Sequence, residues 1–298
     1  MEFIINGDDS IKSILKERKF EIFKWIEEKE QLLQALKQTD VVIVDSYLAG
    51  VEVYKNISDN ARIPVYLDDN CRIDYPAGIV INWNIYATDL DYPQKDDVSY
   101  LLGTGYILLR KAFWDVTERK TKEKVTDVMV TFGGDDSKNL TPRVLSFLTE
   151  EYPWLKKNVI IGNAFKNFGE IKTAADVNTR FIHSPDDRGM KDIISGSDVA
   201  ISSGGQTLYE LACVGVPTVA VAVADNQRNN VIGWKKTAFC VNAGFWTDKD
   251  LMDNIAEGLQ GFMNNSFIRS QSSKIGQSHI KCGGADRVIQ FLQCRISN

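Results

Sequence analysis

Short apolar runs rich in β-branched residues recur along the whole chain and alternate with stretches of helical periodicity. In the first third, the apolar runs lie at 3–5, 20–23, 41–44, 64–67 and 78–81, with helical stretches such as 11–18 and 27–38. Later runs lie at 128–132, 159–161, 181–182, 199–201, 219–223 and 239–241. Each run has the length and composition of a strand buried on both faces of a parallel sheet. The alternation therefore predicts an α/β protein with helices packed on parallel sheets.

One charged stretch interrupts this series and divides the chain into two parts. Residues 115–124 (DVTERKTKEK) are mostly charged and contain no apolar run, as expected of a linker. A chain of 298 residues is long enough for two domains of ordinary size. We therefore predict two doubly wound, Rossmann-type domains, an N-terminal one over 1–115 and a C-terminal one over 125–298.

Composition and charge exclude several classes of function. The net charge of -5 and the pI near 5.3 argue against a nucleic-acid-binding protein with a broad basic face. No apolar run reaches the roughly 18 residues that a membrane span needs, and no signal peptide is visible. Five cysteines without C-x-x-C spacing and two distant histidines indicate a reduced, cytoplasmic protein without a metal site. We expect no cofactor.

The turn after the run at 199–201 carries the strongest functional signal. The segment 202–212 (SSGGQTLYELA) places Gly204 and Gly205 between a strand and a helix. Glycines let backbone N–H groups approach a ligand closely, and a helix N-terminus favours an anion. Glu210, one turn into the helix, can accept hydrogen bonds from a ribose diol. Alternatively, Thr207 and Glu210 form a capping box that only stabilises the start of the helix.

A second pair of glycines, Gly133 and Gly134, follows the strand at 128–132. If both strands belong to one parallel sheet, both turns leave the same edge, and a diphosphate between two helix N-termini needs few lysines. Either pair taken alone is also compatible with a tight connection that binds nothing. Two pairs in one domain favour the diphosphate site.

Polar residues at other strand ends extend this candidate site. Asp45 and Asp68 follow strands of the first domain, at the edge where open α/β sheets bind ligands. The segment 225–230 (DNQRNN) suits sugar hydroxyls or, alternatively, a solvated loop that caps a helix. Ser184 and Asp187 form a candidate cap after the strand that ends near Ile182.

At these positions the chain resembles a known family. The matching residues are Gly133-Gly134-x-Asp136, Glu210, Asn226-Gln227, the segments 44–47, 67–69 and 82–87, and the run LGxxYxLLRxxF at 102–113. They are similar to the two-domain nucleotide-sugar enzymes of the GT-B fold. Within that fold the chain looks closest to the UDP-sugar hydrolases of the pseudaminic-acid pathway and to the related spore-coat polysaccharide proteins, over essentially its whole length.

The resemblance implies that water displaces UDP from a UDP-linked 2,4-diacetamido-2,4,6-trideoxyhexose in a cleft between the domains. By analogy, Glu210 holds the ribose, the backbone around Ile182 reads the uracil, and Tyr47 faces the sugar. Gly133, Gly134, Gly204, Gly205, Gln206 and Thr207 complete the predicted nucleotide site, and Asn226 and Gln227 contact the sugar.

One feature of the family is missing. Its members open with a strand and a Gly-x-Gly-His turn whose histidine is the expected base, and the sequence contains no such motif. The resemblance therefore implies a shortened first domain, either because the sequence is a shortened form or because the protein has lost that group. Asp45, Asp68 or Asp69 must then orient or deprotonate the water. Because Asp68 and Asp69 are adjacent at a strand end, they point to opposite sides and at most one serves.

Three functions therefore remain open. The first is the hydrolase, and the second is a UDP-sugar-dependent glycosyltransferase of the same fold. The third is a non-catalytic UDP-sugar-binding protein that works beside a cytidylyltransferase, for which the missing histidine is the main support.

Overall fold

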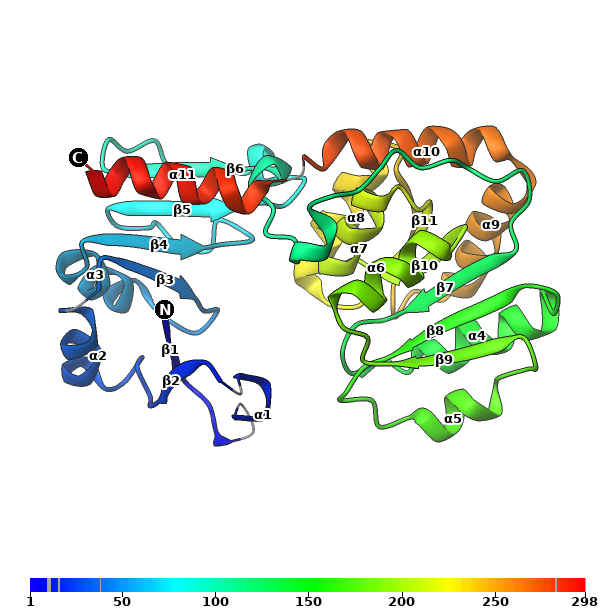
Figure 1. The fold of residues 1–298 in the computed structure, drawn as a ribbon, viewed down its shortest axis with the longest axis horizontal. Coiled ribbons are helices and arrows are strands. Elements are labelled where there is room, and N and C mark those ends of the chain that lie inside the picture. Colours follow the sequence, from blue (N-terminus) through cyan, green and yellow to red (C-terminus); the bar gives the residue numbers. More distant parts are fainter. Residues whose placement is uncertain (10–11, 16, 38, 282, 298) are drawn as a thin grey trace. The chain divides into compact units, whose positions relative to one another are not determined.

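The computed structural model describes residues 1–298 apart from 10–11, 16, 38, 282 and 298 (Figure 1). The chain forms two compact units. The first contains Met1–Trp83, Ala87–Leu102 and Val288–Asn298, and the second contains Asn84–Tyr86 and Gly103–Arg287. The expected units were 1–115 and 125–298. The structure instead ends the main part of the first unit at Leu102, gives Asn84–Tyr86 to the second unit, and gives Val288–Asn298 to the first.

The chain's last helix, α11 (Gly284–Ser297), explains one of these differences. Its final turns join the first unit, where Arg295 donates to the Ser99 hydroxyl at 2.6 Å. The Ile296 carbonyl accepts from Arg62 at 2.7 Å. A prediction that places a single boundary in the chain cannot assign the C-terminal helix to the N-terminal unit.

The first unit is built on a four-stranded parallel sheet in sequential order, β3-β4-β5-β6. Its strands are β3 (Val41–Asp45), β4 (Ile63–Leu67), β5 (Gly78–Asn82) and β6 (Val98–Leu102). The helices α2 (Lys29–Leu36) and α3 (Val51–Asn60) cover it through an aromatic core in which Tyr54, Tyr66 and Tyr75 are mutually in contact. A short 3-10 turn, η2 (Ala87–Asp89), precedes β6.

A separate pair of parallel strands lies at the start of the chain. It consists of β1 (Glu2–Ile5) and β2 (Lys19–Ile22), with the short helix α1 (Lys12–Leu15) between them in the sequence. The helices α1 and α2 lie inside the predicted stretches 11–18 and 27–38, whose residues 11, 16 and 38 lie outside the described residues.

The second unit contains a six-stranded, fully parallel sheet in the order β12-β11-β10-β7-β8-β9. The strands are β7 (Asp127–Thr131), β8 (Lys156–Ile161), β9 (Thr179–His183), β10 (Val199–Ser203), β11 (Thr218–Ala222) and β12 (Cys240–Phe245). The order reverses between β7 and β10, and open α/β sheets bind ligands beside such a reversal, at the carboxyl ends of the strands.

Helices cover both faces of this sheet, as predicted for a doubly wound domain (Figure 1). One face packs against α4 (Leu140–Glu151), α5 (Phe168–Thr173) and α9 (Leu251–Asn264). Strands β7, β10 and β11 also contact α6 (Asp187–Gly196), α7 (Gln206–Val214) and α8 (Asp225–Lys236). The helix α10 (Ser266–His279) packs on α7. Two 3-10 turns, η3 (Thr104–Tyr106) and η4 (Lys111–Phe113), lie in the segment that enters the unit. Among the described residues, the structure contains no helix with the length and apolar character that crossing a membrane requires.

Candidate functional site

The two glycine turns of the second unit leave the same edge of its sheet. Strands β7 and β10 are parallel neighbours in which Ser202 lies beside Thr131. Gly133 and Gly134 therefore follow β7 on the side where Gly204 and Gly205 follow β10. This arrangement is the geometric condition that a shared diphosphate site requires.

A cavity of about 700 Å³ opens at this edge. Its lining includes Gly133, Gly134 and Ser203 at the ends of β7 and β10, and Gln227 on the first turn of α8. Lys138 also lines it. The cavity thus collects residues from the first glycine turn, from the end of β10 directly before the second turn, and from the predicted sugar-binding segment.

One position in each turn requires glycine, for packing in one case and for backbone conformation in the other. A Cβ atom on Gly204 would lie 2.3 Å from Val231, and Gly133 has a positive φ of 88°. Gly162, which directly follows β8, was not predicted to matter. A Cβ there would lie 2.2 Å from the Gly134 carbonyl oxygen. The loop after β8 therefore packs directly against the glycine turn at 133–134.

The helix after the second turn begins without a capping box. The N-cap of α7 is Gly205, and no side chain caps it. The capping-box interpretation of Thr207 and Glu210 is therefore wrong. Gln206 and Thr207 form the first turn of α7, where Gln206 donates to the Leu108 carbonyl at 3.4 Å.

Glu210 is 2% exposed and forms a two-pronged ion pair with Arg110. The Arg110 Nε donates to one carboxylate oxygen at 2.7 Å and Nη2 donates to the other at 2.8 Å. Asp187 at the start of α6 accepts from Arg110 Nη1 at 3.4 Å. Burial raises the pKa of Glu210, and the pairing with Arg110 opposes that shift. Arg110 stands in the motif at 102–113, but no role was predicted for its side chain.

The predicted sugar-binding pair lies on the first turn of α8. Gln227 lines the cavity, and its side-chain oxygen accepts from the Val223 amide at 3.1 Å. Asn226 beside it is exposed. One turn later, buried Asn230 donates to the Gly204 carbonyl and contacts the Tyr209 hydroxyl, which ties α8 to the second glycine turn.

Ile182 lies apart from these residues. It is on β9, the outer strand next to β8, where it pairs with Ile160. The helix after β9 is capped by Asp186, whose side chain accepts from the Gly189 amide at 2.8 Å. The prediction that Ser184 and Asp187 form this cap is wrong, because Ser184 has a positive φ and its amide bonds back to the Ile161 carbonyl.

An aromatic wall on the cavity was missed. Phe245 and Trp246, at the end of β12, both line it. The Arg228 guanidinium lies 3.4 Å from the centroid of the Phe245 ring, and the Lys138 ammonium lies 4.6 Å from that of Trp246. The rings thus hold two cations beside the glycine turns, at an edge where anions are favoured. The available signal was a pair of adjacent aromatic residues shortly after the apolar run at 239–241.

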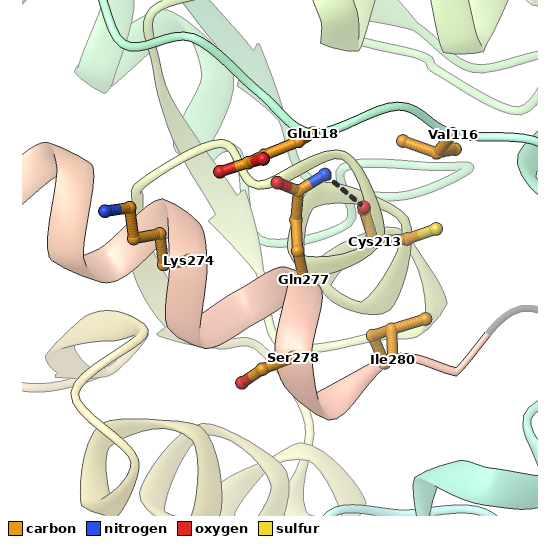
Figure 2. Close-up of a pocket in the computed structure, with 7 residues that line it drawn as sticks. All are labelled: Val116, Glu118, Cys213, Lys274, Gln277, Ser278 and Ile280. Atoms are coloured by element: carbon orange, nitrogen blue, oxygen red, sulfur yellow. Dashed lines mark hydrogen bonds between the residues drawn. The ribbon is translucent and has the colours of Figure 1, made fainter.

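A smaller cavity of about 370 Å³ in the same unit contains none of the predicted residues (Figure 2). Gln277 extends into it from α10 and donates to the carbonyls of Cys213, at 3.4 Å, and Thr117, at 3.0 Å. It also accepts from the Arg119 amide at 3.0 Å. These bonds attach the irregular segment before β7 to α7 and α10, which gives Gln277 a structural role.

In the first unit, Asp68 is the centre of a buried network. Its carboxylate accepts from the amides of Cys71 and Arg72, and from the hydroxyls of Tyr75 and Tyr92. Four donors match the acceptor capacity of a carboxylate. Asp68 therefore closes the loop after β4.

Asp45 and Tyr47 have more open surroundings. Tyr47 is 57% exposed and its hydroxyl donates to Asp69. Burial and the nearby Asp69 charge both raise the pKa of Asp45, which ends β3. Asp45, Tyr47 and Asp69 thus form one acidic group. From the sequence, Asp69 was named as an alternative to Asp45 and Asp68 for activating water, and no contact of Asp69 with Tyr47 was predicted.

Comparison with known proteins gives relatives at low identity, and no family model matches the chain. The spore coat polysaccharide biosynthesis protein SpsG of Bacillus subtilis is 26% identical over 281 residues, covering 90% of this chain and 81% of that protein. The UDP-2,4-diacetamido-2,4,6-trideoxy-beta-L-altropyranose hydrolase of Campylobacter jejuni is 22% identical, covering 70% of this chain and 76% of that protein. The chain is a homologue of these proteins.

The resemblance drawn from the motifs is thereby confirmed. A Methanocaldococcus jannaschii protein, named as uncharacterized, is 26% identical over 76% of this chain. The chain spans about half of that relative, 49% of its length.

Solved structures show the fold. MurG of Acinetobacter baumannii superimposes with a TM-score of 0.67 at 13% identity, covering 97% of this chain and 90% of that one. The Staphylococcus aureus MnaA structure with UDP gives 0.64 at 12% identity, covering 97% and 87%. The predicted GT-B class of two Rossmann-like α/β units is confirmed.

Proposed function

We propose that this chain binds the UDP group of a nucleotide sugar on its second unit and hydrolyses the bond between UDP and the sugar. The observation that carries the proposal is the pair of glycine turns that follow neighbouring parallel strands, beside a cavity of about 700 Å³. Gly133 and Gly134 of the first turn line this cavity, and so does Ser203, which directly precedes the second turn. The sugar that we propose is a 2,4-diacetamido-2,4,6-trideoxyhexose, the class named for the Campylobacter jejuni relative. The product would enter nonulosonic-acid or spore-coat polysaccharide synthesis.

The physical case for a diphosphate rests on the dipoles and cations of this edge. The first turns of α7 and α8 direct backbone N–H groups toward the carboxyl edge of the sheet, and such groups favour an anion. Lys138 adds a positive charge at the cavity. In this proposal the amides of Gly133, Gly134, Gly205, Gln206 and Thr207 hold the diphosphate, Glu210 the ribose, Ile182 the uracil, and Asn226 and Gln227 the sugar. Gly204 shapes the second turn, because its own amide donates to the Val221 carbonyl at 3.0 Å.

For the hydrolytic step we assign water activation to Asp45, with Tyr47 facing the sugar. Asp45 is an acceptor whose pKa is raised by burial and by Asp69, which suits a group that takes up a proton. Asp68, with four donors already bound, supports the loop rather than the reacting water. A general base contributes about 10²–10⁴-fold to the rate of such a reaction.

A glycosyltransferase is the second candidate, because MurG is among the proteins with the same fold. The same nucleotide site would then pass the sugar to an acceptor instead of water. A UDP-sugar-binding protein without catalysis is the third, and a partnership with a cytidylyltransferase remains a prediction from the resemblance.

One assay separates the three. The purified chain is incubated with the UDP-linked 2,4-diacetamido-2,4,6-trideoxyhexose, and UDP release is followed with and without sugar acceptors, alongside calorimetric titration of UDP. UDP release into water supports the hydrolase, and Asp45→Asn should reduce it at least about 100-fold with unchanged UDP affinity.

The same assay can contradict the proposal in two ways. Release that depends on an acceptor would replace the hydrolase with the transferase. Tight binding without release under any condition would leave the binding protein, and absence of UDP binding would remove all three.

A further inference from the structure

Arg110 and Glu210 are 100 positions apart in the sequence, yet they form a bidentate ion pair in the second unit. Both carboxylate oxygens of Glu210 are engaged by one guanidinium, at 2.7 and 2.8 Å. The Glu210 side chain is 3% exposed, whereas that of Arg110 is 35% exposed. The arginine thus approaches a buried carboxylate from the more open side.

A carboxylate at this position needs a partner to stay ionised. Glu210 lies among the buried residues of α7, and burial alone favours its protonated form. The charged groups that act on it are Arg110, from the segment between η3 and η4, and Asp187, from α6. Asp187 opposes ionisation, so Arg110 is the group that favours the charge.

The pairing leaves capacity for a ligand. An ionised carboxylate has about four lone-pair positions, and the guanidinium fork uses two of them. One remaining position on each oxygen can accept from a hydroxyl, and a ribose offers two adjacent hydroxyls. A protonated carboxyl would offer a donor in place of one acceptor.

We propose that Arg110 is a positioning residue that holds Glu210 as an oriented carboxylate and thereby makes the site select ribonucleotides over 2′-deoxyribonucleotides. This inference rests on the proposed function, because it assumes that Glu210 meets the ribose. The inference goes beyond that function in one respect: removing the Arg110 guanidinium, with Glu210 left in place, should abolish the preference for ribonucleotides.

The test compares Arg110→Met, which removes the fork and the charge, with Arg110→Lys, which keeps the charge. Arg143→Met on the exposed side of α4 is the matched control. Calorimetry gives the affinities of each variant for UDP and for 2′-deoxy-UDP, and thermal melting shows that each variant is folded. A role in folding alone would change the melting curve without changing the ratio of the two affinities.

We expect the wild type and Arg143→Met to prefer UDP over 2′-deoxy-UDP by about tenfold, the size of one lost charge-assisted hydrogen bond. Arg110→Met should bring this ratio close to one, and Arg110→Lys should restore part of it. In the double variant Arg110→Met/Glu210→Gln, the ratio should be no lower than in Glu210→Gln alone, because Arg110 acts through Glu210.

A pH series adds a second readout. UDP-N-acetylglucosamine is the probe, because its diphosphate lacks the free terminal phosphate that titrates near pH 6. Without Arg110, the burial that raises the pKa of Glu210 is no longer opposed, so the affinity of Arg110→Met should rise with pH as the carboxyl ionises. Wild-type affinity should be nearly constant over the same range.

Three outcomes overturn the inference. An unchanged ratio in folded Arg110→Met, or a flat pH series in that variant, would show that Arg110 does not act through the charge of Glu210. Tighter UDP binding by Arg110→Met would mean that the arginine competes with the ribose. Failure of the wild type to bind UDP would instead remove the proposed function itself. If Arg110→Met does not fold, Arg110→Gln takes its place in the same measurements.

Discussion

The two ends of strands β7 and β10 are built in opposite ways. At their amino ends, the carboxylate of Asp198 accepts from the amides of Thr126 and Asp127 at 2.8 and 3.0 Å, and Lys122 pairs with it at 2.9 Å. At their carboxyl ends, the same strands lead into glycine turns, and Gly133, Gly134 and Ser203 line a cavity of about 700 Å³. One end is closed by a buried carboxylate with its donors, and the other opens on a cavity that residues of a glycine turn line.

In the second unit, residues that stabilise the fold and residues proposed to bind UDP therefore lie at opposite ends of β7 and β10. A buried carboxylate with several donors fixes the alignment of two strands that are distant in the sequence. An edge with glycine turns presents N–H groups without side chains in the way. We therefore expect substitutions at the amino ends to change unfolding, and most substitutions at the carboxyl ends to change UDP binding.

The largest loss of stability is expected from a substitution at the carboxyl edge, where most other substitutions should change UDP binding. Gly162→Ala lies at the carboxyl edge, but its new Cβ would lie 2.2 Å from the Gly134 carbonyl oxygen. Because backbone must move to relieve such a contact, the variant should lose about 3 kcal/mol of unfolding free energy. Urea denaturation measures the loss.

Gly134→Ala is the matched control. A Cβ on Gly134 would meet nothing within 4 Å, so its stability should stay within about 0.5 kcal/mol of wild type. Equal stabilities of the two variants would mean that the loop after β8 is not packed against the first turn.

At the amino end, Asp198→Asn should cost about 2 kcal/mol of unfolding free energy, because a charged acceptor with several donors is replaced by a neutral amide. UDP affinity should not change in the folded protein. Burial alone raises the pKa of Asp198, but the hydrogen bonds from Lys122, Thr126 and Asp127 outweigh it and hold that pKa below its ordinary value of 3.8.

The pH dependence of this effect has a definite sign. A carboxyl whose pKa is lower in the folded state contributes stability above the unfolded value of 3.8, and the contribution is lost as the pH falls through the folded value. The deficit of Asp198→Asn should therefore be constant near neutral pH and shrink below about pH 4. A deficit that stays constant into strong acid would contradict the assigned role.

Local pattern was enough to predict most strands, for a physical reason. Strands such as β10 and β11 are buried on both faces and read as continuous β-branched runs. The strand β6 was missed because Ser99 and Tyr100 interrupt its apolar run, and both are only partly buried. The glycine turns were predictable because strand, turn and helix are consecutive in the sequence.

The contacts that complete the site were not predictable in this way. Arg110, in the segment before β7, meets Glu210 on α7. Trp246 follows β12, and it lines the same cavity as Gly133, which follows β7. Sequence spacing carries no information on such pairs. Sequence spacing also could not predict that α11 begins in the second unit and ends in the first.

On the binding side of the comparison, Glu210→Ala should weaken UDP binding by about 1.5 kcal/mol, the value of a charge-assisted hydrogen bond to the ribose. Glu257→Ala, on the exposed face of α9, is the control. Calorimetry at neutral pH measures both. Unchanged affinity in a folded Glu210→Ala variant would limit the residue to holding Arg110 in place.

The smallest expected effect concerns the cation over the Trp246 ring. Lys138→Met keeps the apolar stem of the side chain but removes the charge that lies 4.6 Å from the ring centroid. Because the ammonium is partly exposed, its attraction to a diphosphate should be modest, and UDP affinity should fall by about 0.5–1 kcal/mol at low ionic strength. The difference from wild type should shrink as salt is added, since screening weakens exposed charges. Lys172→Met on α5 should bind UDP like wild type at every salt concentration. If Lys138→Met also behaves like wild type at low salt, the backbone amides of the glycine turns hold the diphosphate without this cation, and the contrast between the two strand ends becomes sharper.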